Sequence, residues 1–222
     1  MDTTKNINST LDSSLVSDEL INITTELTEV SIDSLLQDGI LKDIPIIGTL
    51  IGLTRIGVSV RDKLFLKKVL LFLYQLKDIP GEKRQSFIEK INSENKFKTK
   101  VGESIMLLVD KINDYSKADY LGKLFGATIE GKIDYATFLK LANVIDKCYI
   151  PDLDNLIPIY QENSKVVDDT DKDILYNLGL LKNLGVDGQV YMYRSDEKIP
   201  NKKNQLEINK YGRLIFELLL QK

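Results

Sequence analysis

Residues 44–60 read IPIIGTLIGLTRIGVSV, an apolar run interrupted by three glycines and one arginine. The run is more apolar than an ordinary surface helix. Its uncharged part, residues 44–54, has eleven residues, whereas a helix that spans a membrane needs about 20. Pro45 suits the first turn of a helix, because its missing N–H costs nothing there. We therefore expect a helix that begins near Pro45 and packs its apolar side chains against a neighbour.

The glycines of this run follow a spacing that permits close helix packing. Gly48 and Gly52 form a G-x-x-x-G pair, and Gly57 lies about one turn further on. Small residues at this spacing let two helices approach closely, in a protein core or in lipid. Three interpretations stay open: a close-packed core turn, conditional membrane contact, or a permanent anchor. The candidate membrane or assembly residues are Ile46, Ile47, Gly48, Leu50, Ile51, Gly52 and Gly57.

The segment that follows is a second apolar helix with a basic beginning. Residues 64–76 are apolar on nearly every side, which is typical of a helix at the centre of a bundle or against lipid. Anionic headgroups attract each nearby Lys or Arg by about 1 kcal/mol. The candidate anionic-surface residues are Arg55, Arg61, Lys63, Lys67 and Lys68.

Charge is distributed unevenly along the chain, although the net charge is only −3. Residues 1–43 carry nine acids and two bases, a balance of −7, and residues 55–100 carry twelve bases and five acids, a balance of +7. The two regions could be independent solvated surfaces, or the acidic part could cover the basic one. The second alternative contains a switch: if residues 1–43 move aside, the basic, apolar region is exposed.

Classical catalysis has little support in this composition. The chain has no histidine, so Ser-His and Cys-His pairs are excluded. Cys148 lies on an apolar helix and is expected in the core, and no Walker or dinucleotide motif is present. Residues 126–137 imitate an EF-hand loop but lack most of the carboxylates that calcium needs. We expect no enzyme, no cofactor and no metal, with carboxylate or Lys/Tyr chemistry as the remaining enzymatic alternative.

Three parts are expected along the chain. Residues 1–30 form a mostly disordered acidic leader, residues 31–151 a helical bundle that contains the glycine-rich segment, and residues 152–222 a winged-helix-like module. Ser31 is expected to cap a short helix, Ser116 and Asp119 to form a capping box, and Asp134 to cap the helix after it. The fold class is therefore mainly α.

The module at the end of the chain reads as helix, hairpin and helix. We expect a helix over 174–184, strands over 189–194 and 205–208, and a final helix capped by Asn209. This order is similar to the second half of winged-helix domains. Acidic side chains at the start of the first helix would repel phosphates, so a structural wing is favoured over a DNA reader. These acids are Asp168, Asp169, Asp171 and Asp173.

Several segments resemble a group of uncharacterised bacterial helical proteins: IPIIGT, IGVSVRDKLF, YLGKLF and EGKIDYATF, within residues 40–215. The terminal LGLL and YG portion is similar to the Abi-alpha type abortive-infection proteins. The resemblance implies a bacterial, cytosolic origin and a phage-defence or toxin context. It carries no site residue to this chain.

These observations together predict a non-enzymatic interaction or effector protein, with residues 44–76 making conditional membrane contact or assembling with a second copy. The expected partners are a protein, a second copy of the chain or an anionic membrane surface, and no small-molecule substrate is identified. The single cysteine and the lack of a signal-peptide pattern predict a cytoplasmic protein, peripheral at the inner membrane when it binds there. The alternative is a winged-helix regulator that binds nucleic acid, which the acids above disfavour.

Overall fold

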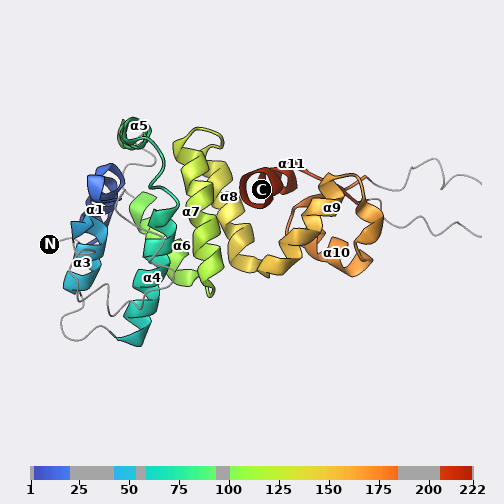
Figure 1. Ribbon diagram of the computed structural model, residues 1–222, viewed down its shortest axis with the longest axis horizontal. Coiled ribbons are helices and arrows are strands. Elements are labelled where there is room, and N and C mark those ends of the chain that lie inside the picture. Colours follow the sequence, from blue (N-terminus) through green and yellow to red (C-terminus); the bar gives the residue numbers. More distant parts are fainter. Residues whose placement is uncertain (1–2, 21–42, 54–58, 94–100, 185–205, 222) are drawn as a thin grey trace, which may run out of the picture. The chain divides into compact units, whose positions relative to one another are not determined.

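The computed structural model describes residues 3–20, 43–53, 59–93, 101–184 and 206–221, and Figure 1 draws their helices and strands. The described residues are mainly helical, with one small antiparallel sheet near the C-terminus. The expected class, a helical bundle with a β-hairpin, is confirmed. The chain divides into two compact units, Met1–Ala142 and Asn143–Lys222, whereas the sequence analysis places the division at residue 151.

The N-terminal unit is built from helices around a central pair, α4 and α7 (Figure 1). Helix α6 packs on α4, and α1 contacts α3, α5 and α6. The elements are α1 (Thr3–Val16), η1 (Asp18–Leu20), α3 (Pro45–Leu53), α4 (Val60–Tyr74), α5 (Gly81–Ser93), α6 (Val101–Lys111), α7 (Tyr115–Ile129) and α8 (Tyr135–Lys147), which continues into the second unit.

Side-chain caps fix where these helices begin. Ser59 and Asp62 form a reciprocal capping box at the start of α4. The expected box at Ser116 is wrong, because Asp114 caps α7 by accepting the Ser116 N–H at 2.8 Å, and the helix begins two residues earlier. Asp134 accepts the Thr137 N–H at 2.6 Å, which confirms the expected cap of α8.

An aromatic cluster marks the core of the N-terminal unit. The ring of Phe125 in α7 lies 5.5 Å from Phe72 of α4, 5.4 Å from Phe87 of α5 and 5.3 Å from Phe138 of α8, measured between centroids. Tilted and edge-on pairs at these distances are favourable beyond the area that they bury. Phe125 therefore joins four helices at one point.

A glycine sets the close contact between α4 and α7. A Cβ atom on Gly122 would lie 2.5 Å from the carbonyl oxygen of Phe72 and 2.9 Å from Cβ of Gln75. Contacts this short do not occur between real atoms, so only glycine fits. The small-residue packing that the sequence analysis assigns to residues 48–57 is thus found at Gly122 in the central helix pair.

Helix α1 replaces most of the disordered leader expected over residues 1–30. Leu11 and Leu15, one turn apart, are each 1% exposed, and Ser14 between them is buried. This spacing places the three side chains on one face, which packs on the rest of the unit. The expected helix that begins at Ser31 lies outside the described residues, as does the remainder of that leader after Leu20.

The C-terminal unit contains short helices and the two-stranded sheet. The strands β1 (Leu181–Asn183) and β2 (Leu206–Ile208) are antiparallel, with Leu181 opposite Ile208. The other elements are η4 (Ile150–Asn155), α9 (Leu156–Tyr160), η5 (Ser164–Val166), α10 (Asp169–Asn177), α11 (Lys210–Ile215) and the π-helical turn η7 (Phe216–Leu220).

The expectations for the C-terminal unit are confirmed in part. The helix expected over 174–184 is wrong in its second half, because α10 ends at Asn177 and Gly179 takes a positive φ of 76° before β1 begins. The expected strand over 189–194 lies outside the described residues. The end of the second strand and the Asn209 cap are confirmed, since Asn209 Oδ1 accepts the N–H groups of Tyr211 and Gly212.

Candidate interaction site at the N-terminal helix pair

Helix α3 carries most of the predicted membrane or assembly residues. Ile46 and Ile47 are 0% exposed, so one face of the helix is fully covered. The remaining predicted side chains differ from these two, because Gly48, Leu50 and Ile51 are half-buried and Gly52 is exposed. Gly57 lies outside the described residues.

Helix α1 covers this buried face, and Figure 1 shows the two helices side by side. The Ser14 hydroxyl of α1 accepts the backbone N–H of Ile46 at 2.8 Å and donates to the Thr10 carbonyl at 2.7 Å. The first N–H groups of a helix have no partner within that helix. Ser14 therefore caps α3 from a different helix, and Leu11 and Leu15 on the same face of α1 are buried.

Two further contacts hold α1 in place. Asn8 accepts the Glu103 N–H at the start of α6 at 3.0 Å, and a Cβ atom on Gly102 would lie 2.9 Å from Cα of Asn8. Asn92 of α5 donates to Asp12 at 3.4 Å. Burial raises the pKa of Asp12, while the Asn92 hydrogen bond acts in the opposite direction. One carboxylate in this contact is thus held where its charged form is disfavoured.

Gly52 does not make the close contact that its spacing suggests. Among the described residues, no atom lies within 4 Å of the place that its Cβ would take. The surface beside Leu50 and Ile51 is therefore open at this glycine. A contact that uses Gly52 would have to come from outside the described part of this chain.

The predicted cation Lys68 is already engaged within the unit. Its ammonium group donates to the carbonyl oxygens of Asp110, at 2.7 Å, and Ile112, at 2.9 Å. These carbonyls end α6, where a cation is favoured by the helix dipole. Burial lowers the pKa of Lys68, and Asp110 acts in the opposite direction. Lys68 stabilises the end of a helix and is not presented to a surface.

The other predicted cations are more exposed. The Arg61 side chain is 85% exposed and lies 3.9 Å from the Asp110 carboxylate. The ammonium of Lys67 lies 4.7 Å from the centre of the Tyr115 ring, within the range of a cation–π contact. Lys63 is half-buried in the first turn of α4, and Arg55 lies outside the described residues.

A groove brings two of these cations together with apolar side chains. It has a volume of about 540 Å³ and lies between the first half of α4 and the α6–α7 junction. Leu64 on its edge is 48% exposed. The residues that line it are Arg61, Leu64, Phe65, Lys68, Asp110, Ile112, Asn113, Asp114 and Tyr115. The structure thus joins Arg61 and Lys68 at one groove.

A second groove, of about 780 Å³, lies between α5 and the α7–α8 turn. Its walls include the apolar side chains of Phe87, Ile129 and Ile133. Glu130 at its edge is held by Lys132 at 2.7 Å and faces Lys83 at 3.9 Å. Two neighbouring lysines therefore balance the charge of its carboxylate.

Sequence reasoning missed the buried arginine of α5. Arg84 is 2% exposed and shares the inner face of this helix with Phe87 and Ile88. The signal was present in the spacing, because residues 84, 87, 88 and 91 fall on one side of a helix. An arginine on an apolar face needs a partner for its charge.

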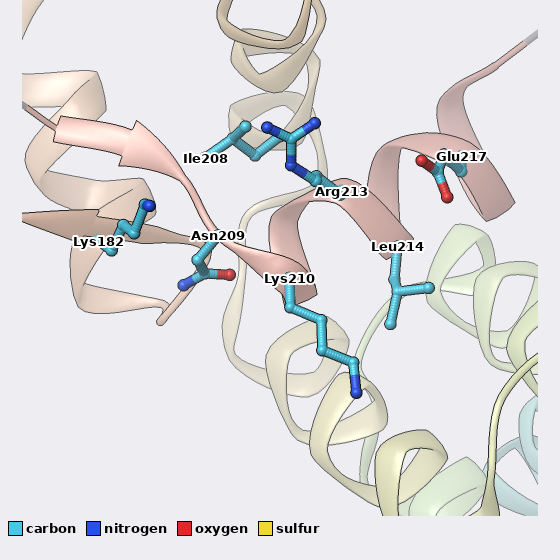
Figure 2. A pocket seen from close by; sticks show the side chains of 7 residues that line it. All are labelled: Lys182, Ile208, Asn209, Lys210, Arg213, Leu214 and Glu217. Carbon is cyan, nitrogen blue, oxygen red and sulfur yellow. The ribbon is translucent and has the colours of Figure 1, made fainter.

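The C-terminal unit has a smaller groove of about 460 Å³ that carries basic side chains. In Figure 2, the Lys210 and Arg213 side chains leave α11 in opposite directions of the view, and Lys182 lies on β1. Lys182 pairs with Glu207 at 3.4 Å, and the Arg213 guanidinium lies 5.9 Å from the Tyr160 ring centre. The cations line the groove without converging on one point.

Three further features bear on the candidate chemistry of the described residues. Cys148 is buried and its thiol donates to the Ile145 carbonyl at 3.4 Å, so the expected core position is confirmed. Within the described ranges, no group of three His, Cys, Asp or Glu side chains could hold a metal ion. None of the helices in those ranges is both long enough and apolar enough to cross a membrane.

In comparisons with protein-family models, curated proteins and solved structures, nothing matches this chain. The helix pair, the grooves and the buried arginine therefore have to be interpreted from their own contacts.

Proposed function

We propose that this chain is a non-enzymatic bacterial effector whose α3 helix leaves α1 and makes contact with an anionic membrane surface. The observation that supports it is the packing of α1 on the apolar helix α3, and we call α1 the cover. Ile46 and Ile47 of α3 are fully buried, α1 contacts this helix, and the Ser14 hydroxyl of α1 accepts the Ile46 N–H. The rings described around Phe125 belong to α4, α5 and α8, and not to α1 or α3.

The free energies on the two sides of this exchange are similar. Leu11 and Leu15 are fully buried, which is worth about 1.5–3 kcal/mol each and so roughly 3–6 kcal/mol for the cover. A membrane offers burial to Ile46 and Ile47 and adds about 1 kcal/mol for each nearby cation. A modest trigger can therefore shift the balance from the covered to the exposed state.

Basic side chains on the first half of α4 support the choice of an anionic surface. Arg61 is almost fully exposed, and Lys67 and Lys63 lie on the same half of the helix. Lys68 keeps its place at the end of α6 in this proposal and does not reach the membrane. The bacterial, cytosolic setting and a phage-defence context come from the sequence resemblance alone.

Vesicle flotation tests this function with a matched pair of variants. Leu15→Asp removes the apolar anchor of the cover, and Leu107→Asp makes the same change at a leucine that is 62% exposed on α6. We expect Leu15→Asp to float with phosphatidylglycerol vesicles far more than the parent protein, and not with phosphatidylcholine vesicles. Leu107→Asp should behave as the parent protein.

Equal flotation of Leu15→Asp and Leu107→Asp would contradict the proposal. If in addition neither variant floats and Leu15→Asp has a doubled mass in light scattering without lipid, the exposed α3 face serves self-assembly. In cells, over-expression of Leu15→Asp should depolarise the membrane, and Leu107→Asp should leave its potential unchanged.

A second candidate function is nucleic-acid binding by the C-terminal unit as a winged-helix regulator. The observation that favours it is the groove of Figure 2, where Lys182, Lys210 and Arg213 are spread along one strand and one helix. Separated cations suit a chain of phosphates better than a single anion. The acids Asp169 and Asp171 at the start of α10, in the same unit, act against it.

Salt dependence tests this second candidate. Binding of a fluorescent DNA duplex should weaken steeply with salt, and Lys210→Ala should reduce the slope of log K against log [salt] by about 1. Lys165→Ala, an exposed lysine in η5, serves as the control. A duplex that does not bind at low salt, or that binds with the same slope for both variants, excludes the function.

A further inference from the structure

Arg84 is an arginine that the N-terminal unit buries without pairing. It is 2% exposed, and among the described residues nothing accepts a hydrogen bond from its Nε or Nη1 atoms. A buried guanidinium ordinarily has its donors and its charge matched by carboxylates or carbonyls, because an unpaired buried charge is strongly unfavourable. This side chain therefore disfavours the state in which it is buried.

The contacts of α1 and α5 place Arg84 near the end of the cover. The two helices contact each other, and Asp12 of α1 receives a hydrogen bond from Asn92 of α5. Asp18 of η1, six residues after Asp12, is the acid whose charge acts on Arg84. Arg84 in turn lies eight residues before Asn92 in α5. The two relationships run in opposite directions along the chain, from Asp12 to Asp18 on one side and from Asn92 to Arg84 on the other, as expected for antiparallel segments.

Neighbouring side chains leave this charge incompletely balanced. Asp18 is exposed and makes no direct ion pair with Arg84 among the described contacts. Burial lowers the pKa of Arg84, and the Asp18 carboxylate opposes this change. Leu20, at the end of η1, is 0% exposed. Arg84 is thus held in an environment that is unfavourable for its charge.

We propose that Arg84 is a phosphate-binding residue that becomes available when α1 and η1 move away, and that its ligand is the phosphate of an anionic lipid headgroup. This inference rests on the proposed function and names the group recognised there. A guanidinium is planar, always charged and weakly hydrated, and it matches the oxygens of a phosphate group. The Nε and Nη1 donors of Arg84, which lack acceptors among the described residues, can donate hydrogen bonds to such oxygens.

The inference gives Arg84 two effects that a purely structural arginine would not combine. In the covered state its charge works against the cover, so removing the charge strengthens the cover. In the exposed state it binds phosphate, so removing it also weakens membrane contact. Arg84→Met keeps a long apolar side chain and removes the charge. Lys90→Met makes the same charge change at an exposed position of the same helix.

The first measurement needs no lipid. Hydrogen exchange at the Ile46 amide reports on the cover, because this N–H donates to Ser14. We expect exchange in Arg84→Met to be slower than in the parent protein, by about tenfold or more, because relief of an unpaired buried charge is large. Lys90→Met should exchange as the parent does. Equal or faster exchange in Arg84→Met overturns the inference.

The second measurement identifies the source of the phosphate. In the Leu15→Asp background, where the cover is already open, phosphatidylglycerol vesicles should bind Leu15→Asp and Leu15→Asp/Lys90→Met alike, and Leu15→Asp/Arg84→Met at least tenfold more weakly. Inorganic phosphate at matched ionic strength should not speed Ile46 exchange. If inorganic phosphate speeds it in the parent and not in Arg84→Met, free phosphate is the ligand and the lipid assignment is wrong.

The outcomes separate this inference from the proposed function. If the parent protein and Leu15→Asp both fail to bind vesicles, the proposed function fails, and the exchange of Arg84→Met still decides whether the buried charge acts against the cover. If vesicles bind Leu15→Asp and Leu15→Asp/Arg84→Met equally, the proposed function stands and Arg84 is not its phosphate ligand.

Discussion

The hydroxyl of Ser14 in α1 accepts the backbone N–H of Ile46 in α3 at 2.8 Å, although 32 positions separate the two residues. One helix thereby caps another. Both side chains are fully buried, so water cannot replace this hydrogen bond while the helices stay together. The contact couples the position of α1 to the stability of the apolar α3 helix.

Ser14→Ala should therefore destabilise the protein by about 1–3 kcal/mol, because it leaves the Ile46 N–H buried without an acceptor. Urea denaturation measures this change. Ser13→Ala is the matched control, since the Ser13 hydroxyl is exposed and bonds only to the Ser9 carbonyl of its own helix. A loss of the same size in both variants would show that the Ser14–Ile46 contact is unimportant.

Glycine substitutions should separate the two roles proposed for small residues. Gly122→Ala should cost about 1–3 kcal/mol or prevent folding, because its Cβ would overlap the Phe72 carbonyl. Gly52→Ala should stabilise by roughly 0.5–1 kcal/mol, because the site is open and alanine favours a helix. Thermal unfolding of both variants checks this pair, and a large loss at Gly52 would contradict the open surface.

The pH dependence of Asp12→Asn follows from the direction of its pKa shift. Because burial raises the pKa of Asp12 above its ordinary value of 3.8, the folded protein holds a proton that the unfolded chain has released. Asp12 therefore lowers stability as the pH rises above 3.8. Asp12→Asn should be more stable than the parent protein at neutral pH and equal to it below pH 3.8, as measured by urea denaturation.

Asp114→Asn should show the opposite sign. The hydroxyl and N–H of Ser116 donate to Asp114 and lower its pKa, so its carboxylate stabilises the protein above pH 3.8 and this stabilisation is lost as the pH falls. The variant should be less stable than the parent protein at neutral pH. If Asp12→Asn and Asp114→Asn both gained stability, or both lost it, at neutral pH, the opposite pKa shifts of the two carboxyl groups would be contradicted.

Substitutions of two basic residues on α4 should separate an effect on stability from an effect on membrane contact. Lys68→Met should cost about 1–3 kcal/mol, because the carbonyls of Asp110 and Ile112 lose a charged donor. Arg61→Met should cost less than about 1 kcal/mol, as exposed ion pairs do, and should weaken vesicle binding. Denaturation and flotation are measured on both variants. A large loss of stability in Arg61→Met together with weaker vesicle binding in Lys68→Met would contradict these two roles.

Local signals were enough to predict much of this fold. The start of α3 at Pro45, the apolar α4 and the caps Asp134 and Asn209 depend on neighbours a few residues away, and the structure confirms them. The end of α10 was misjudged because apolar periodicity continues through Gly179 into β1, and the pairing of Leu181 with Ile208 decides the structure there. A strand partner far along the chain leaves no local trace.

The candidate site was predictable only in part. Spacing identified the apolar residues of α3, but it could not show that Ser14 caps them, because that contact joins two distant segments. Lys68 looked like a surface cation until the end of α6 was seen beside it. Arg84 was overlooked because a single base among apolar residues has no motif, and its burial depends on how other segments pack around α5.

A reversible lock between α1 and α5 tests the central claim, that α1 must leave for α3 to bind a membrane. Asp12→Cys and Asn92→Cys place thiols where two half-buried side chains meet, and a reducible bis-maleimide joins them, while the thiol of Cys148 is buried. Flotation with phosphatidylglycerol vesicles is measured before and after reduction in the Leu15→Asp background. The locked protein should stay in solution and the reduced protein should float; flotation that is equal in both states would contradict the account.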